Sequence, residues 1–487
     1  MVSVSRIVAG ARLPQDRVAA VALALAGIGT FSIMLRGPWG IGPFLLGLVL
    51  LAWRDRRLLV MALGLSIPLT TAGWSVEIVE ISGRILDVRL AITFGVAVIG
   101  FAAVITGPMP RPSRLEAIFL ALIGWSVVSG VLVADSPLTW APPVARLVVY
   151  FSLFALARRH LHTARDLAVL MALIATGFAV PTFAGLVQFV VGQAEFINEA
   201  VRATAPGDRG PIALAFDGQM TLVLAFALLA TAVRTRIRVG WLVAVIIGAA
   251  GLLVSATRLV TVTAWAVLVA AAALRRRWRT ALAVTLFFGL ALVARPDLAG
   301  RFFGTFGEPS PTLPGASPTP TPEDGAEGEN VDASLRFRFF VWSTILEGWM
   351  EQPITGIGPG MTARLVAAES PAERTAPHND YVGAFAELGV PGLVLFVLLQ
   401  LSVLRGLYLA ATSLRGPARD LVTTIGLLFV GTNVLGALNN PIYFLDVQIA
   451  LWSLVGTALA VGAASSGYRS SMRSAIAASD ATADPAS

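Results

Sequence analysis

The sequence predicts an all-α, polytopic integral membrane protein, and three observations carry that prediction. Of the 487 residues, 56% are hydrophobic and only 13% are charged, whereas a soluble protein has about 25% charged residues. The mean hydropathy is +0.77, and the apolar residues occur in long blocks separated by short polar loops. The net charge of +7 would suggest a nucleic-acid partner in a soluble protein, but the basic residues, all of them arginine, lie mostly in these loops.

The apolar blocks sort into fourteen segments that are suited to cross a bilayer, for which about 17–25 residues are needed. Twelve or thirteen spans result instead if 38–74 or 239–274 holds fewer separate helices than we assign. The expected spans lie near residues 18–35, 38–53, 58–74, 89–107, 115–133, 140–157, 167–191, 211–233, 239–255, 259–274, 280–295, 389–410, 421–437 and 442–462.

Arginine clusters predict the orientation of these helices, because cytoplasmic loops are enriched in basic residues. Each cluster follows an even-numbered helix, and the basic N-terminus falls on the same side. The prediction is therefore a chain with both ends in the cytoplasm. The clusters are "RDRR" (54–57), "RPSR" (111–114), "RRHLHTAR" (158–165), "RTRIR" (234–238), "RRRWR" (275–279), "LRGPAR" (414–419) and "YRSSMR" (468–473).

The chain divides around one long outer loop. Helices 1–11 occupy 1–295, the extracytoplasmic loop 296–388, helices 12–14 389–466, and a disordered cytoplasmic tail 467–487. Within the loop, "EPSPTLPGASPTPTPEDGAEGENVDA" (308–333) is rich in Pro, Thr, Gly and acidic residues, cannot bury a core and is expected to be disordered. The segments 334–353 and 377–389 have helical patterning and predict short amphipathic helices at the membrane surface.

Three polar residues are expected on the outer side, where basic residues run against the usual bias. His378 and Arg338 lie in the long loop, and Arg258 lies in a very short turn between two helices. An imidazole accepts a proton near neutral pH, and guanidinium groups bind phosphate oxygens in a bidentate manner. This combination suits transfer from a lipid diphosphate, whose charge grows as it leaves, without a metal or another cofactor.

The segment "RFFVW…EQPITGIGPG…PHNDYVGAFAELGVPGL" resembles the signature region of the O-antigen ligase and O-antigen polymerase superfamily, closely over residues 250–395. "SATR" (255–258) resembles the Ser-x-x-Arg turn that lies upstream in that family. The matching positions are Arg338 and Trp342, then Pro353, Gly356 and Gly358, then His378, Asn379, Glu387 and Gly389.

The resemblance implies transfer or polymerisation of an undecaprenyl-diphosphate-linked glycan onto an acceptor hydroxyl at the outer face of the bacterial cytoplasmic (inner) membrane. His378, Arg338 and Arg258 are the expected catalytic residues. The partners are the lipid-linked donor, a saccharide or lipid acceptor and membrane lipids, with no nucleic acid. The sequence does not separate ligase from polymerase or identify the sugar. Weaker candidates for substrate binding are Arg336, Asn379, Trp342, Gly358 and Arg146.

Structural explanations compete with each of these roles. His378 could be a helix-start residue, Arg338 could extend to the interface beside tryptophans, and the glycines at 356–360 fit a plain turn better than a phosphate cradle. Two other functions also stay open. One is a metal-dependent lipid-linked glycosyltransferase that uses Glu77 and Glu80, and the other is a non-enzymatic transporter of lipid or polysaccharide.

Overall fold

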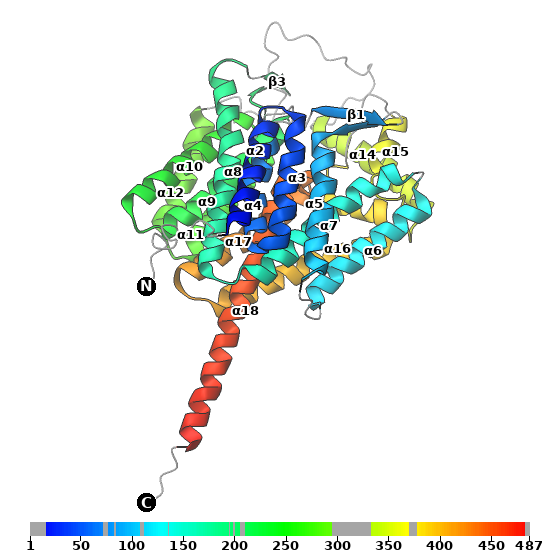
Figure 1. Ribbon diagram of the computed structural model, residues 1–487. Helices are drawn as coiled ribbons and strands as arrows, with labels where there is room; N and C mark the ends of the chain where they lie inside the picture. The colour runs from blue at the N-terminus through cyan, green and yellow to red at the C-terminus, as the bar shows by residue number, and fades with distance from the viewer. Residues whose placement is uncertain are drawn as a thin grey trace, which may run out of the picture.

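A computed structural model describes the chain at residues 16–71, 76–81, 84–107, 112–134, 136–193, 195–197, 200–204, 210–294, 333–369 and 377–482. It is a helical bundle with two small strand pairs at one end (Figure 1). The predicted all-α class of a polytopic membrane protein is therefore confirmed. The proposed disordered insert, apart from Ala333, lies outside the described residues.

Each of the fourteen apolar segments coincides with a helix. In the described part of the chain, ten helices are long and apolar enough to cross a membrane, and three shorter stretches are apolar. The number of spans and their orientation stay predictions. The helices are α2 (Arg17–Met34), α3 (Ile41–Arg54), α4 (Arg56–Thr70), α5 (Val88–Ile105), α6 (Arg114–Val133), α7 (Pro137–His160), α8 (Ala164–Val190), α9 (Gly210–Thr231), α10 (Thr235–Ser255), α11 (Arg258–Leu274), α12 (Trp278–Ala294), α16 (Asp380–Ser413), α17 (Gly416–Gly436) and α18 (Leu445–Thr482), with 3-10 turns η1 (Pro38–Gly40) and η4 (Pro441–Tyr443).

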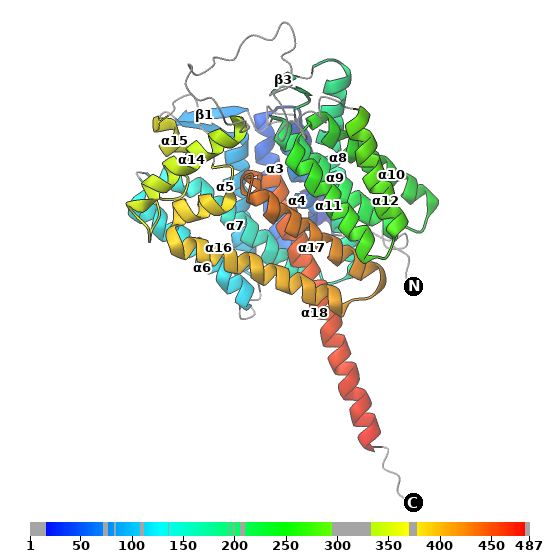
Figure 2. The same cartoon turned by 180° about the vertical axis from the view of Figure 1, so that it is seen from behind.

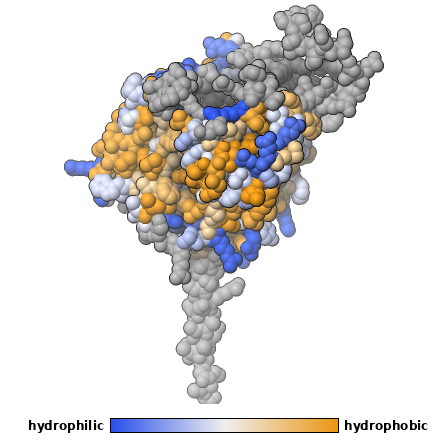
Figure 3. Space-filling view, turned by 90° about the vertical axis from the view of Figure 1, so that its right-hand side faces the viewer, coloured by the Kyte–Doolittle hydropathy of each residue, from blue (hydrophilic) through white to orange (hydrophobic). Residues whose placement is uncertain are grey.

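The bundle has its most enclosed helices at the centre. In α9 and in the first part of α18, 83% of the apolar span is buried against other helices. Helices such as α10 and α12 instead expose large apolar side chains, among them Ile246, Leu286 and Leu290. Hydrophobic side chains cover much of the face drawn in Figure 3. Such a surface is suited to lipid rather than water, since lipid tails are themselves apolar.

Two parts of the chain differ from the sequence-based expectation. The connection between α4 and α5 contains an antiparallel hairpin, β1 (Glu77–Ile81) and β2 (Arg84–Asp87), because runs rich in β-branched residues flank a Ser-Gly pair in the sequence. A second hairpin consists of β3 (Glu195–Ile197) and β4 (Ala200–Arg202). In addition, α18 continues beyond the bundle to Thr482, so 467–482 is helical where we expected a disordered tail (Figure 1). Adding residues to an existing helix needs no new nucleus, and this stretch is rich in alanine and lacks proline.

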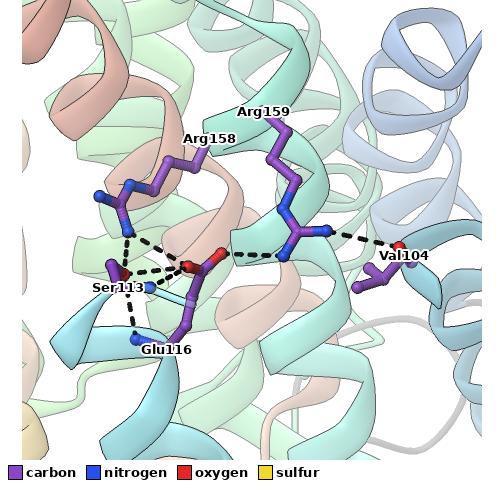
Figure 4. Close-up of polar contacts among 5 residues, drawn as sticks. All are labelled: Val104, Ser113, Glu116, Arg158 and Arg159. Atoms are coloured by element: carbon purple, nitrogen blue, oxygen red, sulfur yellow. Dashed lines mark hydrogen bonds and ion pairs between the residues drawn. The ribbon is translucent and has the colours of Figure 1, made fainter. Parts of the chain in front are cut away.

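Three of the arginine-rich segments, 54–57, 111–114 and 158–165, lie at one end of the bundle. Arg57 pairs with Asp166 at the start of α8, and Arg159 at the end of α7 reaches Glu116 at the start of α6 at 3.2 Å. Figure 4 shows Glu116 between Arg158 and Arg159, with Ser113 completing the helix cap. Since successive helix ends alternate between faces, these contacts bring the basic ends of α3 to α8 to the same face, and the side of the membrane on which this face lies stays a prediction.

Two further helices, α14 (Ala333–Met350) and α15 (Thr362–Glu369), lie beside the first turns of α16 at the other end (Figure 2). The amphipathic pattern expected for 334–353 is visible in their packing. Val341 and Ile345 of α14 are fully buried against Val366 of α15 and Ala386 of α16. The apolar contacts thus hold α14 against the segment that carries His378.

Candidate active site

Helix α16 is broken at Gly389, and this break shapes the site. Gly389 has φ 66° and ψ −170°, a region open essentially to glycine alone. The residues before it form a short helix, as expected for 377–389, and the residues after it form the long apolar helix. Around the break, the α16 carbonyls point to groups from other elements. Trp125 Nε1 donates to the carbonyl of Leu388 at 2.7 Å, and Ser129 Oγ donates to that of Glu387 at 3.1 Å.

The glycine-rich turn 353–360 packs against the same break. The backbone N–H groups of Ile357 and Gly358 donate to the carbonyls of Ala386 and Glu387, at 2.9 and 3.0 Å. A side chain at Gly356 would place its Cβ 2.5 Å from the Glu387 carbonyl carbon. The N–H of Gly358 is therefore used by the protein itself. This arrangement supports the plain-turn interpretation of the glycines over a phosphate cradle.

His378 lies immediately before the N-terminus of α16 and is fixed on both sides. The side-chain oxygen of Asn379 caps the helix by accepting from the N–H groups of Tyr381 and Val382, at 2.9 and 3.0 Å. Trp342 of α14 donates its indole N–H to the carbonyl of Pro377 at 2.6 Å. His378 itself has φ 51°, an uncommon conformation for a residue with a side chain. These contacts hold the backbone in place on both sides of His378.

The surroundings of His378 favour the neutral imidazole. Its pKa is lowered from the usual value of 6.5, first by burial and then by the charge of Arg338, while a hydrogen bond with the Asn439 side chain acts in the opposite direction. The positive end of the α16 dipole also disfavours an imidazolium there. A neutral imidazole at physiological pH is able to accept a proton, so the setting meets the first requirement of a general base.

Arg258 lies at the same end of the bundle as His378. It begins α11 after a turn in which Ala256 adopts φ 49°. At the other end of α11, Arg275 donates to the carbonyl of Asp420 in the first part of α17. Because α16 leads into the start of α17 through a short connection, the beginnings of α11 and α16 both lie at the opposite end from Arg275. Arg258 is half-buried, as is Arg338.

A cavity lies between α6, α7, the first part of α16 and η4. It consists of two adjoining pockets of about 70 and 30 Å³, enough room for ordered water molecules between these elements. Arg146 lines the larger pocket and lies 4.6 Å from the centroid of the Tyr443 ring. Asp380 lines both pockets, and its Oδ1 has no hydrogen-bond partner. The pockets share Leu122, Leu147, Tyr150, Asp380, Phe396 and Ile442.

The expected site residues separate into those that are available for chemistry and those whose side chains hold the fold together. Arg338 lies close enough to His378 for its charge to lower the pKa of the imidazole, and Arg146 faces the cavity. The side chains of Asn379 and Trp342 are used in capping α16 and holding Pro377. Arg336 belongs to α14, and its side chain is not among those described.

Several polar residues near the site were not singled out by the sequence. Asn439, Tyr443 and Asp380 come from a connection and from the residue after the family's His-Asn pair. The signal for Asn439 and Tyr443 in the sequence is the stretch "NNPIY" (439–443) at the edge of an apolar segment, and Asp380 directly follows the His-Asn pair.

The acidic residues of the alternative metal site lie in the β1–β2 hairpin. Glu77 is exposed at the start of β1, and Asp87 caps α5 by accepting from the N–H of Leu90 at 2.7 Å. The side chain of Glu80 lies outside the described set. Among the residues that the structure describes, no group of three or more His, Cys, Asp or Glu side chains is placed to hold a metal ion.

The bundle and its polar centre define a multi-pass helical membrane protein with a candidate catalytic site at one end. A family model described as O-antigen ligase matches residues 220–397, which run from the second half of α9 through α10, α11, α12, α14 and α15 to the first half of α16. This match supports membership of the chain in the O-antigen ligase and polymerase family. The family implies a lipid-linked glycan transferase or ligase activity, with lipid-linked glycans as substrates. No curated protein matches the chain.

Proposed function

We propose that the protein transfers a glycan from a lipid diphosphate to an acceptor hydroxyl, with His378 as the general base. The imidazole takes the proton of the acceptor hydroxyl, and the hydroxyl oxygen forms a bond to the anomeric carbon of the donor sugar. The bond between that carbon and the diphosphate oxygen breaks, and its electron pair leaves with the lipid diphosphate. The observation that carries this proposal is a neutral-favouring histidine fixed beside Arg338 at the N-terminus of α16.

The arginines bind the diphosphate in this proposal. Arg338 is close enough to lower the pKa of His378, and Arg258 lies at the same end of the bundle. Fixed guanidinium groups stabilise the negative charge that grows on the leaving diphosphate, and their planar fork matches two phosphate oxygens. Arg146 faces the cavity between α7 and the first part of α16, and its guanidinium is a further candidate to bind a phosphate oxygen.

The test compares matched histidine and arginine variants in a glycan-transfer assay with purified protein and an undecaprenyl-diphosphate-linked glycan. His378→Ala should reduce transfer by about 10²–10⁴-fold, the usual contribution of a general base. The matched control is His162→Ala, since His162 is exposed in the α7–α8 connection. Near-native transfer by His378→Ala would show that His378 is not the base.

Arginine variants separate binding from proton transfer. Arg258→Lys and Arg338→Lys should weaken binding of undecaprenyl diphosphate, because an ammonium group lacks the bidentate geometry. Arg364→Lys is the matched control, since Arg364 is exposed on α15. His378→Ala should bind that lipid as the wild type does. Adding EDTA tests the metal-dependent alternative that uses Glu77 and Glu80. Removal of the metal would stop transfer in that case, whereas the proposed mechanism predicts unchanged transfer.

A further inference from the structure

The connection between α17 and α18 contacts His378 from a region that lies beyond the family match, which ends at residue 397. In this connection, the Asn439 side chain forms a hydrogen bond with the His378 side chain. Asn439 is only 6% exposed, so this contact is shielded from water. It joins the candidate base to a segment more than sixty residues further along the chain.

The connection is held by contacts with several other elements. Tyr150 donates its hydroxyl to the carbonyl of Ile442 at 2.8 Å, and Arg89 donates to that of Tyr443 at 2.6 Å. The N–H of Ile442 donates to Asp380 Oδ2 at 3.3 Å, only two residues after the histidine. The loop is therefore anchored to α5, α7 and α16, and little conformational freedom is left to lose when it holds a side chain in place.

The orientation of the Asn439 amide is also set locally. Its Oδ1 accepts from the backbone N–H of Asn440 at 2.8 Å, which fixes which edge of the amide carries the oxygen. The bond to His378 favours the protonated imidazole and so raises its pKa, as expected when the imidazole N–H donates to a carbonyl oxygen. One ring nitrogen then carries the proton, and the other has the free electron pair that a base needs.

We infer that Asn439 is a positioning residue, whose side chain holds the His378 imidazole in one tautomer and directs its other ring nitrogen toward the acceptor hydroxyl. This inference rests on the proposed role of His378 as the base. It assigns a part in the reaction to the α17–α18 connection, which contains none of the motif residues. Asn439 acts through His378 and needs no contact with the substrate.

The first experiment measures the hydrogen bond itself, without any activity. The chain has three histidines, so His160→Gln together with His162→Gln leaves His378 as the only imidazole for NMR titration of histidine-labelled protein. The groups that face it are Arg338 of α14 and Asn439, with the Asp380 carboxyl two residues along α16. In this background, Asn439→Ala should lower the pKa of His378, and Asn439→Asp should raise it, because a carboxylate attracts the imidazolium.

Asn440→Ala is the matched control. Asn440 is 4% exposed, and its side-chain oxygen has no hydrogen-bond partner, so its removal should leave the titration of His378 unchanged. If Asn439→Ala fails to accumulate, Asn439→Asp decides the question, since it keeps an oxygen at the same place. A pKa that moves in neither variant, or moves equally in the control, would overturn the inference.

The second experiment measures transfer as a function of pH. Asn439→Ala should lower kcat by about 10- to 100-fold, the effect of a misplaced reacting group, with little change in KM for the donor. The acid limb of the profile should shift to lower pH in Asn439→Ala and to higher pH in Asn439→Asp. If the NMR titration shifts as expected while His378→Ala still transfers glycan, the contact is real and the proposed base is wrong. If His378→Ala is inactive and the Asn439 variants match Asn440→Ala, the positioning role alone fails.

Discussion

Replacing Gly389 with alanine should detach the glycine-rich turn from α16. A Cβ on Gly389 would lie 2.0 Å from the carbonyl oxygen of Ile354, a distance at which the backbone must move. Ile354 belongs to the glycine-rich turn, and this turn is also bound to α16 by the Val390 N–H, which donates to the carbonyl of Pro353 at 3.1 Å. The substitution therefore affects both the break in α16 and the segment that packs against it.

The size of the effect follows from two contributions. A non-glycine residue in this φ,ψ region costs about 1–3 kcal/mol. Loss of the hydrogen bond between Val390 and Pro353 costs a further 0.5–1.5 kcal/mol, roughly. Gly389→Ala should thus lower the free energy of unfolding by about 2–4 kcal/mol if the two contributions add. Because the same break sets the start of the helix that carries His378, glycan transfer should fall as well.

Gly416 supplies the control for this prediction. It has φ +59° at the start of α17, and a Cβ there would meet nothing within 4 Å. Gly416→Ala carries only the cost of a left-handed residue, about 1–2 kcal/mol. The assay is the apparent melting temperature of the detergent-solubilised protein, measured beside transfer activity. Equal losses of stability in the two variants, with transfer intact in both, would refute the reasoning, because the contact with Ile354 would then contribute nothing.

Three further predictions rest on the described contacts. Trp342→Phe should keep the packing of α14 but remove the bond to the carbonyl before His378, and transfer should fall several-fold while the protein still accumulates; unchanged transfer would contradict this. Glu116→Gln should lower the free energy of unfolding by about 1–3 kcal/mol, since two arginines lose a charged partner; an unchanged melting temperature would argue against it. In this cysteine-free chain, an impermeant thiol reagent should label Arg364→Cys in intact cells and Arg276→Cys only after permeabilisation, and the reverse pattern would invert the predicted orientation.

The match between expected spans and helices has a simple physical reason. In a bilayer, the backbone must satisfy its hydrogen bonds within each segment, so a long apolar block is nearly sufficient to define a helix. The arginine clusters follow the same logic, because charged groups remain at the ends of the helices. Helix ends and the β1–β2 hairpin were harder to predict from the sequence, since caps and strand pairing depend on a few local residues. The length of α18 was underestimated because a polar, alanine-rich tail carries no apolar signal of its own.

The sequence by itself determined the class of protein, the positions of its apolar helices and the residues His378, Arg338 and Arg258 as candidates. Composition and order along the chain are enough for these features, since each depends on neighbouring residues. Only the tertiary structure decided that the glycine-rich turn is bound to the carbonyls at Gly389, that Trp342 holds Pro377, and that Asn439 contacts the histidine. These contacts join residues that are distant in the chain, and helix packing, not local sequence, brings them together.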